Sequence, residues 1–360
     1  MLLESLATAV PEPTYSQAEC WEIVRASRAA RRLRPRSREL LRKVLTGPSG
    51  IQKRHFAIDP IDTLFDLDAE SLNRHFEAAA PGLGGQALER ALEPAGWRPE
   101  ELDALFVCTC TGYLCPGVSS YIAEQCGLRP DAFLQDIVGL GCGASVPTLR
   151  SAAHFLAANP AARVAVVAVE ICSAAFYLDD DPGVLISACL FSDGAAAALW
   201  SGDSSTAGWR ASRFRSHHDP ARRDCLRMEN RGGFLRNRLH KSVPARAADA
   251  VRMLFPLPGD ETVDTLLAHP GGRDVLAAIG QAVPGYSLEA SARVLRQHGN
   301  MSSPSLLFVL EELIRDPQGA SEAWLTSFGA GFSCHGFRLS RASAPGDCPI
   351  AIPDRLGAMG

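Results

Sequence analysis

The sequence predicts an α/β protein, and three observations lead to this prediction. The run from residue 163 to 169, Arg-Val-Ala-Val-Val-Ala-Val, is apolar on both faces, which is typical of a strand covered on two sides. Strand-like and helix-like runs alternate along the chain, which indicates βαβ units and a parallel or mixed sheet. Glycine-rich or polar turns follow several strands, which is where α/β proteins place their chemistry.

Length and composition bound the class of protein. The chain has 360 residues, of which 46% are hydrophobic and 21% charged, with a net charge of −4. These values predict a globular protein with two domains or one large duplicated domain. The mildly acidic balance argues against a nucleic-acid partner, and no apolar run is long enough to span a bilayer.

Cysteine usage and the first residues of the chain predict a cytoplasmic location. The 11 cysteines are odd in number and spread along the chain, and several lie in apolar strand-like runs. This fits a reducing compartment better than a disulfide framework. Cys108 and Cys110 do not have zinc-ligand spacing, so we expect no metal. The N-terminus lacks the basic and apolar regions of a signal peptide.

The first half alternates helices and strands. A polar Asp-Asp-Asp-Pro-Gly turn at 179–183 is predicted to be a solvated loop, and the Ser- and Gly-rich stretch 201–208 is the predicted boundary between halves. The predicted helices span 17–45, 69–92 with a break at Pro81, 119–126 and 144–157, and the predicted strands span 102–110, 133–138 and 162–169.

The second half repeats this theme. Predicted strands span 263–268, 324–328 and 332–339, and predicted helices end at Gln281, Arg296 and Ile314. The domains we expect are 1–205, carrying Cys142, and 206–342, carrying His269 and Asn300. Residues 343–360, rich in Pro, Ala and Gly, form a predicted peripheral tail.

Cys142 lies in Gly-Leu-Gly-Cys-Gly-Ala, between a predicted strand and a predicted helix. Unpaired amide groups and the positive end of the helix dipole at this place favour the thiolate. Gly141 and Gly143 carry no side chains, so a substrate carbonyl can approach closely. A buried structural cysteine is the alternative interpretation.

His269 and Asn300 are the two residues that, with Cys142, form a candidate catalytic set. His269 ends a predicted strand and precedes Pro-Gly-Gly, which places its imidazole at a strand tip. Asn300 lies before Met-Ser-Ser-Pro, where Ser303 is placed to cap a helix that begins at Pro304. A thiol with two N–H donors suits the acylation of a thiolate and the stabilisation of an oxyanion. Each residue taken alone has a structural explanation.

These residues lie in strings that resemble the type III polyketide synthases, the chalcone synthase group. The strings are Gly-Leu-Gly-Cys-Gly-Ala, His-Pro-Gly-Gly, Gly-Asn-Met-Ser-Ser, Leu-Phe-Ser-Asp-Gly-Ala with Phe191, and Ser-Phe-Gly-Ala-Gly-Phe. They occur in the family's order over residues 3–340. Ketoacyl-synthase III shares the fold and triad, but its usual His-Gln-Ala-Asn and Asn-Thr-Ser strings are absent here.

The resemblance implies a thiolase-like fold, in which two similar α/β halves form five αβαβα layers, and a homodimer. It also implies an acyltransferase whose substrates are coenzyme A thioesters, with no further cofactor. An acyl-CoA starter loads onto Cys142, and decarboxylated malonyl-CoA attacks the acyl group. Repeated condensation and cyclisation then give a pyrone, a resorcinol or a related aromatic product. His269 and Asn300 supply the N–H donors for the enolate.

The resemblance also assigns a substrate pocket. Phe191 matches a gatekeeper ring, and Ser302, Gly329 and Gly331 belong to the family's strings. Asn237 stands where plant enzymes carry a second gatekeeper phenylalanine, and Cys115 where they carry a methionine that crosses between subunits. The cavity threonines of plant enzymes are replaced by Cys110, Cys172 and Ala175.

These replacements predict a less polar and roomier pocket that prefers a medium- or long-chain aliphatic starter to a hydroxylated aromatic one, or a pocket used by malonyl-CoA alone. The phosphate-binding residues of plant enzymes are not matched one for one. The nearest candidates for binding coenzyme A are Arg42, Lys43, Lys53 and Arg54.

Two other classes of function remain open at this point. Cys, His and Asn also occur in this order in papain-like cysteine hydrolases, although the strings around them differ. Release of free acid from an acyl-CoA without malonyl-CoA would support such a hydrolase or thioesterase. A non-catalytic thiolase-fold partner is the other class, and failure of Cys142 to take up an acyl group would support it.

Overall fold

A mixed nine-stranded sheet runs through both halves of the chain. The computed structural model describes residues 1–58, 60–202, 206–255, 263–317 and 320–342. The strands of this sheet, in spatial order, are β11 (Thr265–Ala268), β12 (Glu322–Gly329), β13 (Ser333–Ala342), β8 (Gly208–His218), β1 (Leu2–Ala9), β7 (Gly194–Ser201), β6 (Arg163–Glu170), β4 (Ala104–Thr109) and β5 (Phe133–Val138).

The two halves of this sheet repeat one topology. In the first half β4 and β6 are parallel, whereas β6 with β7 and β7 with β1 are antiparallel. In the second half β11 and β12 are parallel, whereas β12 with β13 and β13 with β8 are antiparallel. A single register pair between β1 and β8, Leu2 with Arg210, joins the two sets of strands.

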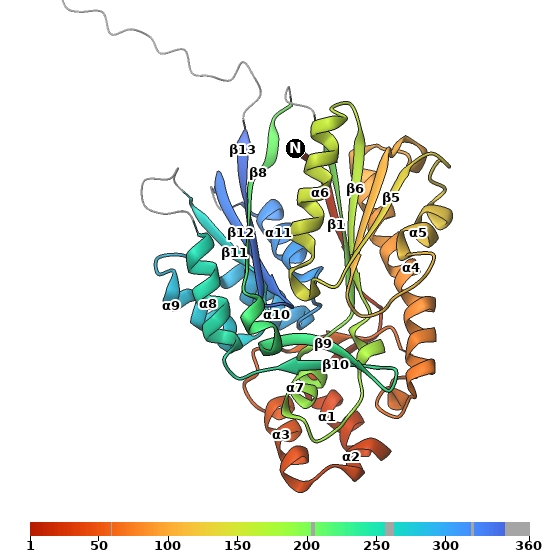
Figure 1. Cartoon of the computed structure of the whole chain (residues 1–360), viewed down its shortest axis with the longest axis vertical. Coiled ribbons are helices and arrows are strands. Elements are labelled where there is room, and N and C mark those ends of the chain that lie inside the picture. The colour runs from red at the N-terminus through yellow and green to blue at the C-terminus, as the bar shows by residue number, and fades with distance from the viewer. Residues whose placement is uncertain (59, 203–205, 256–262, 318–319, 343–360) are drawn as a thin grey trace, which may run out of the picture.

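Helices complete five layers, as Figure 1 shows. The central layer is α6 (Ser145–Ala158) and α11 (Ser305–Arg315), which contact strands of both halves. One outer layer, α4 (Ala69–Ala95) and α5 (Val118–Cys126), covers the strands of the first half. The other is α8 (Val243–Leu254) with α9 (Arg273–Ala282), and α10 (Glu289–His298) packs beside it against α11 and β11. The predicted two-half, five-layer thiolase-like fold is confirmed.

The strongly apolar strands explain why the core lies between these layers. The exposed fraction of every side chain from Val164 to Val169 on β6 is 0%. Central-layer side chains such as Leu149 on α6 and Leu310 on α11 are equally buried and belong to one cluster with strands of both halves. Burial of apolar area of this kind contributes roughly 25 cal/mol per Å² to folding.

A smaller region at one end of the layers carries the remaining elements (Figure 1). It contains the hairpin of β9 and β10, which packs on α7, and α7 in turn packs on α3. Its elements are α1 (Gln17–Ala26), α2 (Arg28–Arg32), α3 (Pro35–Thr46), α7 (Pro182–Leu190), β2 (Thr14–Ser16), β3 (Lys53–His55), β9 (Leu226–Arg231) and β10 (Phe234–Leu239).

Two predicted helices differ from the structure. The predicted helix 17–45 is three helices, because the Ser27 hydroxyl accepts from the Ala30 amide and starts α2, and Pro35 starts α3. The predicted break at Pro81 is absent, because α4 continues to Ala95 with its buried face against β1, β6 and β7.

The domain bounds remain predictions. Residues 203–205, at the predicted boundary, and the predicted tail 343–360 lie outside the described residues. Within the described residues, no helix has both the length and the apolar character needed to cross a membrane.

Candidate active site

The loop that carries Cys142 lies where the two halves meet. Residues Gly141–Gly143 form a short 3-10 turn that leads into α6. Gly141 has φ +58, and a Cβ there would lie 3.0 Å from the Ala330 amide nitrogen. A Cβ on Gly329 would lie only 2.3 Å from the Leu140 carbonyl oxygen. The Cys142 loop of the first half therefore presses against the end of β12 from the second half, and glycine is required at this contact.

His269 and Asn300 reach the same place from two loops of the second half. His269 directly follows β11, its ring is 0% exposed, and it packs edge-on against Phe328 with ring centroids 5.1 Å apart. Neither ring nitrogen of His269 has a hydrogen-bond partner among the described residues. The Asn300 Nδ2 donates to the Gly271 carbonyl across 3.2 Å, and Oδ1 accepts from the Ser302 amide at 2.8 Å.

One channel brings these side chains together. A cavity of about 860 Å³ has Cys142, His269, Asn300 and Phe191 in its wall. Phe191 is fixed to Asn300 by backbone hydrogen bonds on either side, from the Asn300 amide to the Leu190 carbonyl (3.0 Å) and from the Ser192 amide to the Asn300 carbonyl (2.9 Å). The volume is that of a typical small-molecule site.

Burial favours the uncharged forms of Cys142 and His269. Burial, with the Glu170 charge in addition, raises the pKa of the Cys142 thiol to about 12. Burial alone lowers the pKa of His269 to about 3. At neutral pH the two groups are therefore a thiol and a neutral imidazole. The sequence analysis favoured a thiolate at the helix terminus, whereas burial favours the thiol.

A buried carboxylate, which the sequence analysis did not assign, lies beneath the cysteine. Glu170 ends β6 and is 0% exposed. Its Oε2 accepts from the Cys110 amide (2.9 Å) and from the amide and hydroxyl of Thr111 (3.1 and 2.8 Å). Its Oε1 accepts from the Ser303 hydroxyl (2.6 Å) and the Ser302 hydroxyl (3.3 Å). The signal in the sequence is a charged residue directly after a strand that is apolar on both faces.

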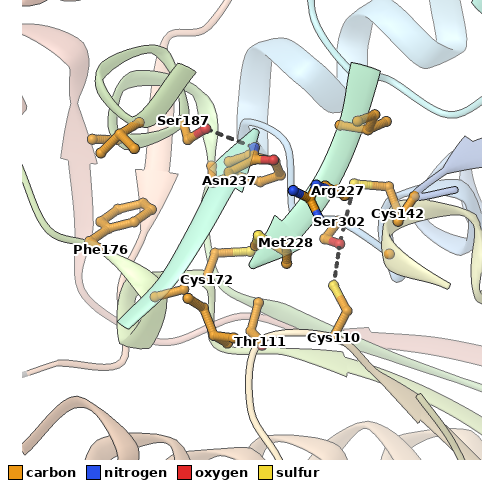
Figure 2. A pocket seen from close by; sticks show the side chains of 18 of the residues that line it. Cys110, Thr111, Cys142, Cys172, Phe176, Ser187, Arg227, Met228, Asn237 and Ser302 are labelled. Carbon is orange, nitrogen blue, oxygen red and sulfur yellow. Dashed lines mark hydrogen bonds between the residues drawn. The ribbon is translucent and has the colours of Figure 1, made fainter. Parts of the chain in front are cut away.

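A second, inner cavity opens beyond Cys142 (Figure 2). It shares Cys142, Phe191, Leu226 and Asn237 with the channel. Of the pocket residues predicted from the sequence, the structure places six in its wall besides Cys142: Cys110, Cys172, Ala175, Phe191, Asn237 and Ser302.

This inner cavity is small, about 50 Å³. Phe176, Met228 and Leu235 stand in its wall beside the smaller Cys110, Cys172 and Ala175. That this pocket is roomier than that of the plant enzymes remains a prediction. Its wall is mainly apolar. Gly329 and Gly331 do not line either cavity, although Ala330 between them lines the inner one. Gly329 belongs to the backbone contact with the Cys142 loop, whereas the Gly331 amide donates to the Leu226 carbonyl across 3.1 Å.

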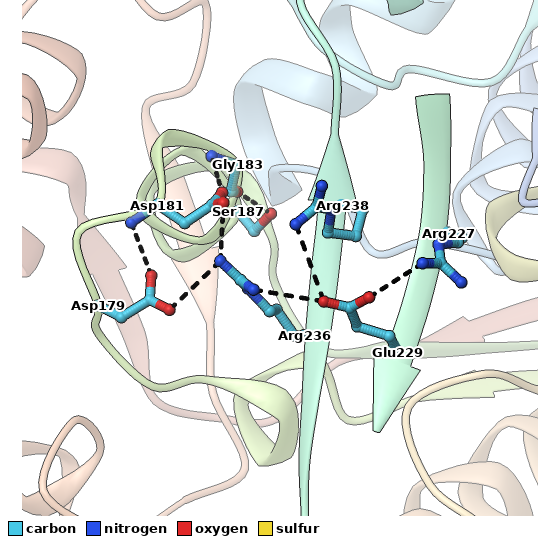
Figure 3. Close-up of polar contacts among 8 residues, drawn as sticks. All are labelled: Asp179, Asp181, Gly183, Ser187, Arg227, Glu229, Arg236 and Arg238. Atoms are coloured by element: carbon cyan, nitrogen blue, oxygen red, sulfur yellow. Dashed lines mark hydrogen bonds and ion pairs between the residues drawn. The ribbon is translucent and has the colours of Figure 1, made fainter. Parts of the chain in front are cut away.

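The β9–β10 hairpin supplies Met228 and Leu235 to the wall of the inner cavity. Gly232 and Gly233, both with positive φ, form its two-residue turn, a signal that the sequence analysis did not use. Arg236 on β10 is nine-tenths buried and binds Asp181 (2.8 Å) and Glu229 (3.3 Å), with Asp179 at 3.7 Å, as Figure 3 shows. The predicted solvated loop 179–183 is therefore an anchor for the hairpin.

The basic residues divide into two groups. Lys43 lines the channel, together with Arg238, Lys241 and Arg273, which the sequence analysis did not select. Arg42 pairs with Glu39 on the surface, and neither Arg42 nor Lys53 lines the channel.

Arg54 is 0% exposed and donates to the carbonyls of Ala188 (2.7 Å) and Phe191 (3.1 Å). The prediction that Arg54 binds coenzyme A is wrong, because its side chain is enclosed and fixes the backbone behind Phe191.

Cys115 lies apart from both cavities. It is exposed and does not belong to either cavity wall. Among the described residues, no three His, Cys, Asp or Glu side chains are grouped so that they could hold a metal ion.

The fold and the site define a class of enzyme: an acyltransferase in which a cysteine and two N–H donors meet between two similar α/β halves. Comparison with known proteins identifies the family. Residues 11–254 match the family described as FAE1/Type III polyketide synthase-like protein, and residues 232–340 match the C-terminal domain of chalcone and stilbene synthases. The chain belongs to the type III polyketide synthase family.

Individual relatives agree with this assignment. The chain is 32% identical to a 3,5-dihydroxyphenylacetyl-CoA synthase of Amycolatopsis orientalis, over 86% of this chain and 84% of the relative. It is 31% identical to a 1,3,6,8-tetrahydroxynaphthalene synthase of Streptomyces peucetius subsp. caesius, over 93% and 91% of the two chains. The crystal structure of the tetrahydroxynaphthalene synthase of Streptomyces coelicolor A3(2) superimposes with a TM-score of 0.83 at 25% identity, covering 96% of this chain and 100% of that one.

Proposed function

We propose that the protein loads an acyl group from a coenzyme A thioester onto Cys142 and extends it with malonyl-CoA. The observation that supports this most is the convergence of Cys142, His269 and Asn300 in the wall of one channel. Type III polyketide synthases form carbon–carbon bonds by decarboxylative condensation and cyclise the product to an aromatic ring or a pyrone. We assign this chemistry to these three residues.

His269 is the base for loading. Because the resting pair is neutral, the thiol proton passes to the imidazole as the sulfur attacks the thioester carbonyl. The leaving thiolate of coenzyme A then takes that proton from His269. Acyl transfer therefore returns the site to its starting charge, and no ion is left in the buried site.

Asn300 and His269 then stabilise the enolate of the extender. Loss of CO₂ from malonyl-CoA moves the negative charge of its carboxylate onto the thioester oxygen. The Asn300 amide and a ring N–H of His269, whose two nitrogens have no partner among the described residues, are the donors for that oxygen. The enolate carbon attacks the acyl carbonyl, and the Cys142 sulfur leaves. Phe191 excludes water from the reacting carbon.

The outer channel is the proposed coenzyme A site. Lys43, Arg238, Lys241 and Arg273 in its wall offer positive charge to the phosphates, and no other cofactor is proposed. The inner cavity of about 50 Å³ favours a short acyl starter. Of the two starters expected from the sequence, malonyl-CoA fits this cavity better than a medium- or long-chain acyl-CoA.

Two substitutions test the proposed roles. Removing one oxyanion donor typically costs about 100- to 1000-fold in rate. We therefore expect Asn300→Ala to lose malonyl-CoA decarboxylation by that factor and to retain acylation of Cys142, measured by intact-protein mass spectrometry. His269→Ala should impair both steps, and Cys142→Ala should give no adduct. Wild-type decarboxylation by Asn300→Ala would disprove the assignment.

We also propose that the protein is a homodimer joined at β5. This strand is an edge of the nine-stranded sheet, and its Phe133, Leu134 and Val138 are 46%, 36% and 49% exposed. An edge strand with exposed apolar side chains favours pairing with another chain. The exposed Cys115 then has a partner subunit to reach. We expect wild type to sediment as a dimer and Val138→Lys to sediment as a monomer; a monomeric wild type would contradict the proposal.

A cytoplasmic location remains a prediction.

A further inference from the structure

Arg227 is the one charged side chain in the wall of the inner cavity. Among the described residues that line it, the others are apolar, thiol, hydroxyl or amide groups. Figure 2 shows Arg227 among the side chains around this cavity, together with Cys142 and Ser302. An acyl group on Cys142 would therefore lie in the inner cavity, whose wall includes Arg227. The Arg227 side chain is 39% exposed, so its guanidinium keeps contact with solvent while it lines the cavity.

The neighbours of Arg227 hold its side chain but leave donors free. Its Nη2 lies 3.1 Å from Glu229 Oε2, and its Nε lies 3.0 Å from Asp224 Oδ1. Glu229 is shared with Arg236 and Arg238 (Figure 3), and Asp224 is 79% exposed, so solvent screens its charge. No protein group in the described residues binds Nη1 of Arg227. Two N–H groups of a fixed guanidinium are therefore available to an anion.

We propose that Arg227 binds the free carboxylate of the starter, so that the acyl group held on Cys142 is a short dicarboxylic acid half-thioester, malonyl first of all. This inference rests on the proposed acylation of Cys142. Loading is thioester exchange: the bond to the coenzyme A sulfur breaks, the bond to Cys142 Sγ forms, and the distal carboxylate is carried over unchanged. The small cavity accommodates a malonyl group, and no aliphatic tail is needed to fill it.

The two ends of the site then act on carboxylates in opposite ways. A cation that pairs with a carboxylate stabilises the ground state and opposes its decarboxylation. Arg227 therefore protects the starter in the inner cavity. Phe191, His269 and Asn300 surround the extender with uncharged groups, which favour moving its charge onto the thioester oxygen. This difference explains how one enzyme can keep one malonyl carboxylate and remove another.

The test compares malonyl-CoA with isovaleryl-CoA, its neutral analogue of the same branched shape, as starters. Loading rates onto Cys142 are measured in an Asn300→Ala background, where decarboxylation is suppressed. Loss of a charge-assisted hydrogen bond corresponds to about 10- to 100-fold in rate. Arg227→Gln should therefore lower the ratio of malonyl to isovaleryl loading by about that factor.

Arg238→Gln is the matched control, because Arg238 also faces Glu229 but lines only the outer channel. It should slow both substrates alike and leave the ratio unchanged. Arg227→Lys, which keeps the charge without the planar fork, should lower the ratio several-fold and serves if Arg227→Gln does not fold.

An unchanged ratio in folded Arg227 variants would overturn the inference while leaving the proposed function intact. A wild-type protein that loads neither thioester would instead overturn the proposed function.

Discussion

The Ser302 hydroxyl lies 3.3 Å from the Cys142 sulfur, and the same oxygen lies 3.3 Å from Glu170 Oε1. Ser302 has φ +61, a strained conformation for a residue with a side chain, and its amide donates to Asn300 Oδ1. One serine therefore connects the nucleophile, the amide donor and a buried carboxylate. The protonation of Cys142 depends on this arrangement.

The first prediction concerns the pH dependence of Cys142 reactivity. Because burial raises the pKa of its thiol to about 12, the thiolate fraction grows with pH throughout the neutral range. The rate of Cys142 alkylation by iodoacetamide should rise about tenfold per pH unit from about pH 6 to pH 9, without a plateau.

Peptide mass spectrometry separates Cys142 from the exposed Cys115, and Cys142→Ala gives the background. A plateau with a midpoint below pH 7 would show a thiolate–imidazolium pair in the free enzyme and would contradict the neutral pair described above.

The second prediction is that Glu170→Gln changes stability and reactivity in opposite directions. The glutamine amide cannot accept all the hydrogen bonds that the carboxylate accepts, so the free energy of unfolding should fall by about 1–3 kcal/mol. Loss of the nearby negative charge removes one of the causes, after burial, that raise the pKa of Cys142. Alkylation of Cys142 near pH 8 should therefore become faster.

Urea unfolding and the alkylation assay measure the two effects. Glu311→Gln provides the control, because Glu311 is also mostly buried and accepts from Thr8 but lies in α11, away from the cysteine contacts. It should lower stability without changing Cys142 reactivity. Slower alkylation in Glu170→Gln would refute the electrostatic role of Glu170.

The sequence predicts the fold and the three central residues because their signals are local. Apolar runs such as 163–169 form strands, and Cys142, His269 and Asn300 each lie in a loop directly beside a predicted strand or helix. Ends of elements from both halves meet at one place in this topology. Pro81 shows the limit of a local rule, since packing of α4 on three strands outweighs one missing helical hydrogen bond.

Cavity size and charge state could not be predicted in this way, because they depend on contacts between distant residues. Met228 and Leu235 lie on a hairpin that Asp181 anchors through Arg236. The sequence predicts that Asp181 lies in a solvated loop, so this contact is not visible there. The pKa of Cys142 follows burial produced by the whole fold, whereas the helix terminus next to it is visible in the sequence.

The third prediction is that Met228→Ala enlarges the inner cavity and accepts longer starters. Each buried methylene contributes roughly 0.8 kcal/mol, or about fourfold in kcat/KM per added carbon until the space is filled. We expect wild type to lose activity as an acyl-CoA starter lengthens and Met228→Ala to gain it over the first few carbons. Met253→Ala, the same change on the exposed face of α8, should behave as wild type. An unchanged chain-length profile would show that Met228 does not limit the cavity.

The fourth prediction concerns Arg236, the anchor of the hairpin. Arg236→Gln removes the cation that Asp179, Asp181 and Glu229 share. All three carboxylates are partly buried. Removing one partner of a fully buried pair costs about 3–5 kcal/mol, and these carboxylates are a quarter to a third exposed, so we expect about 1–3 kcal/mol. The loss should be local, because the hairpin pairs only with itself and packs mainly on α7.

Hydrogen exchange is the decisive measurement for this anchor. Amides of β9 and β10 should exchange faster in Arg236→Gln, while those of β6 and β7 in the central sheet keep their protection. Arg231→Gln, at the exposed end of β9, should leave the hairpin as protected as in wild type. Since Met228 and Leu235 close the inner cavity from this hairpin, its loosening should also broaden the range of starters loaded onto Cys142. If exchange and starter range both stay as in wild type, packing on α7 holds the hairpin and the ion pairs of Arg236 do not.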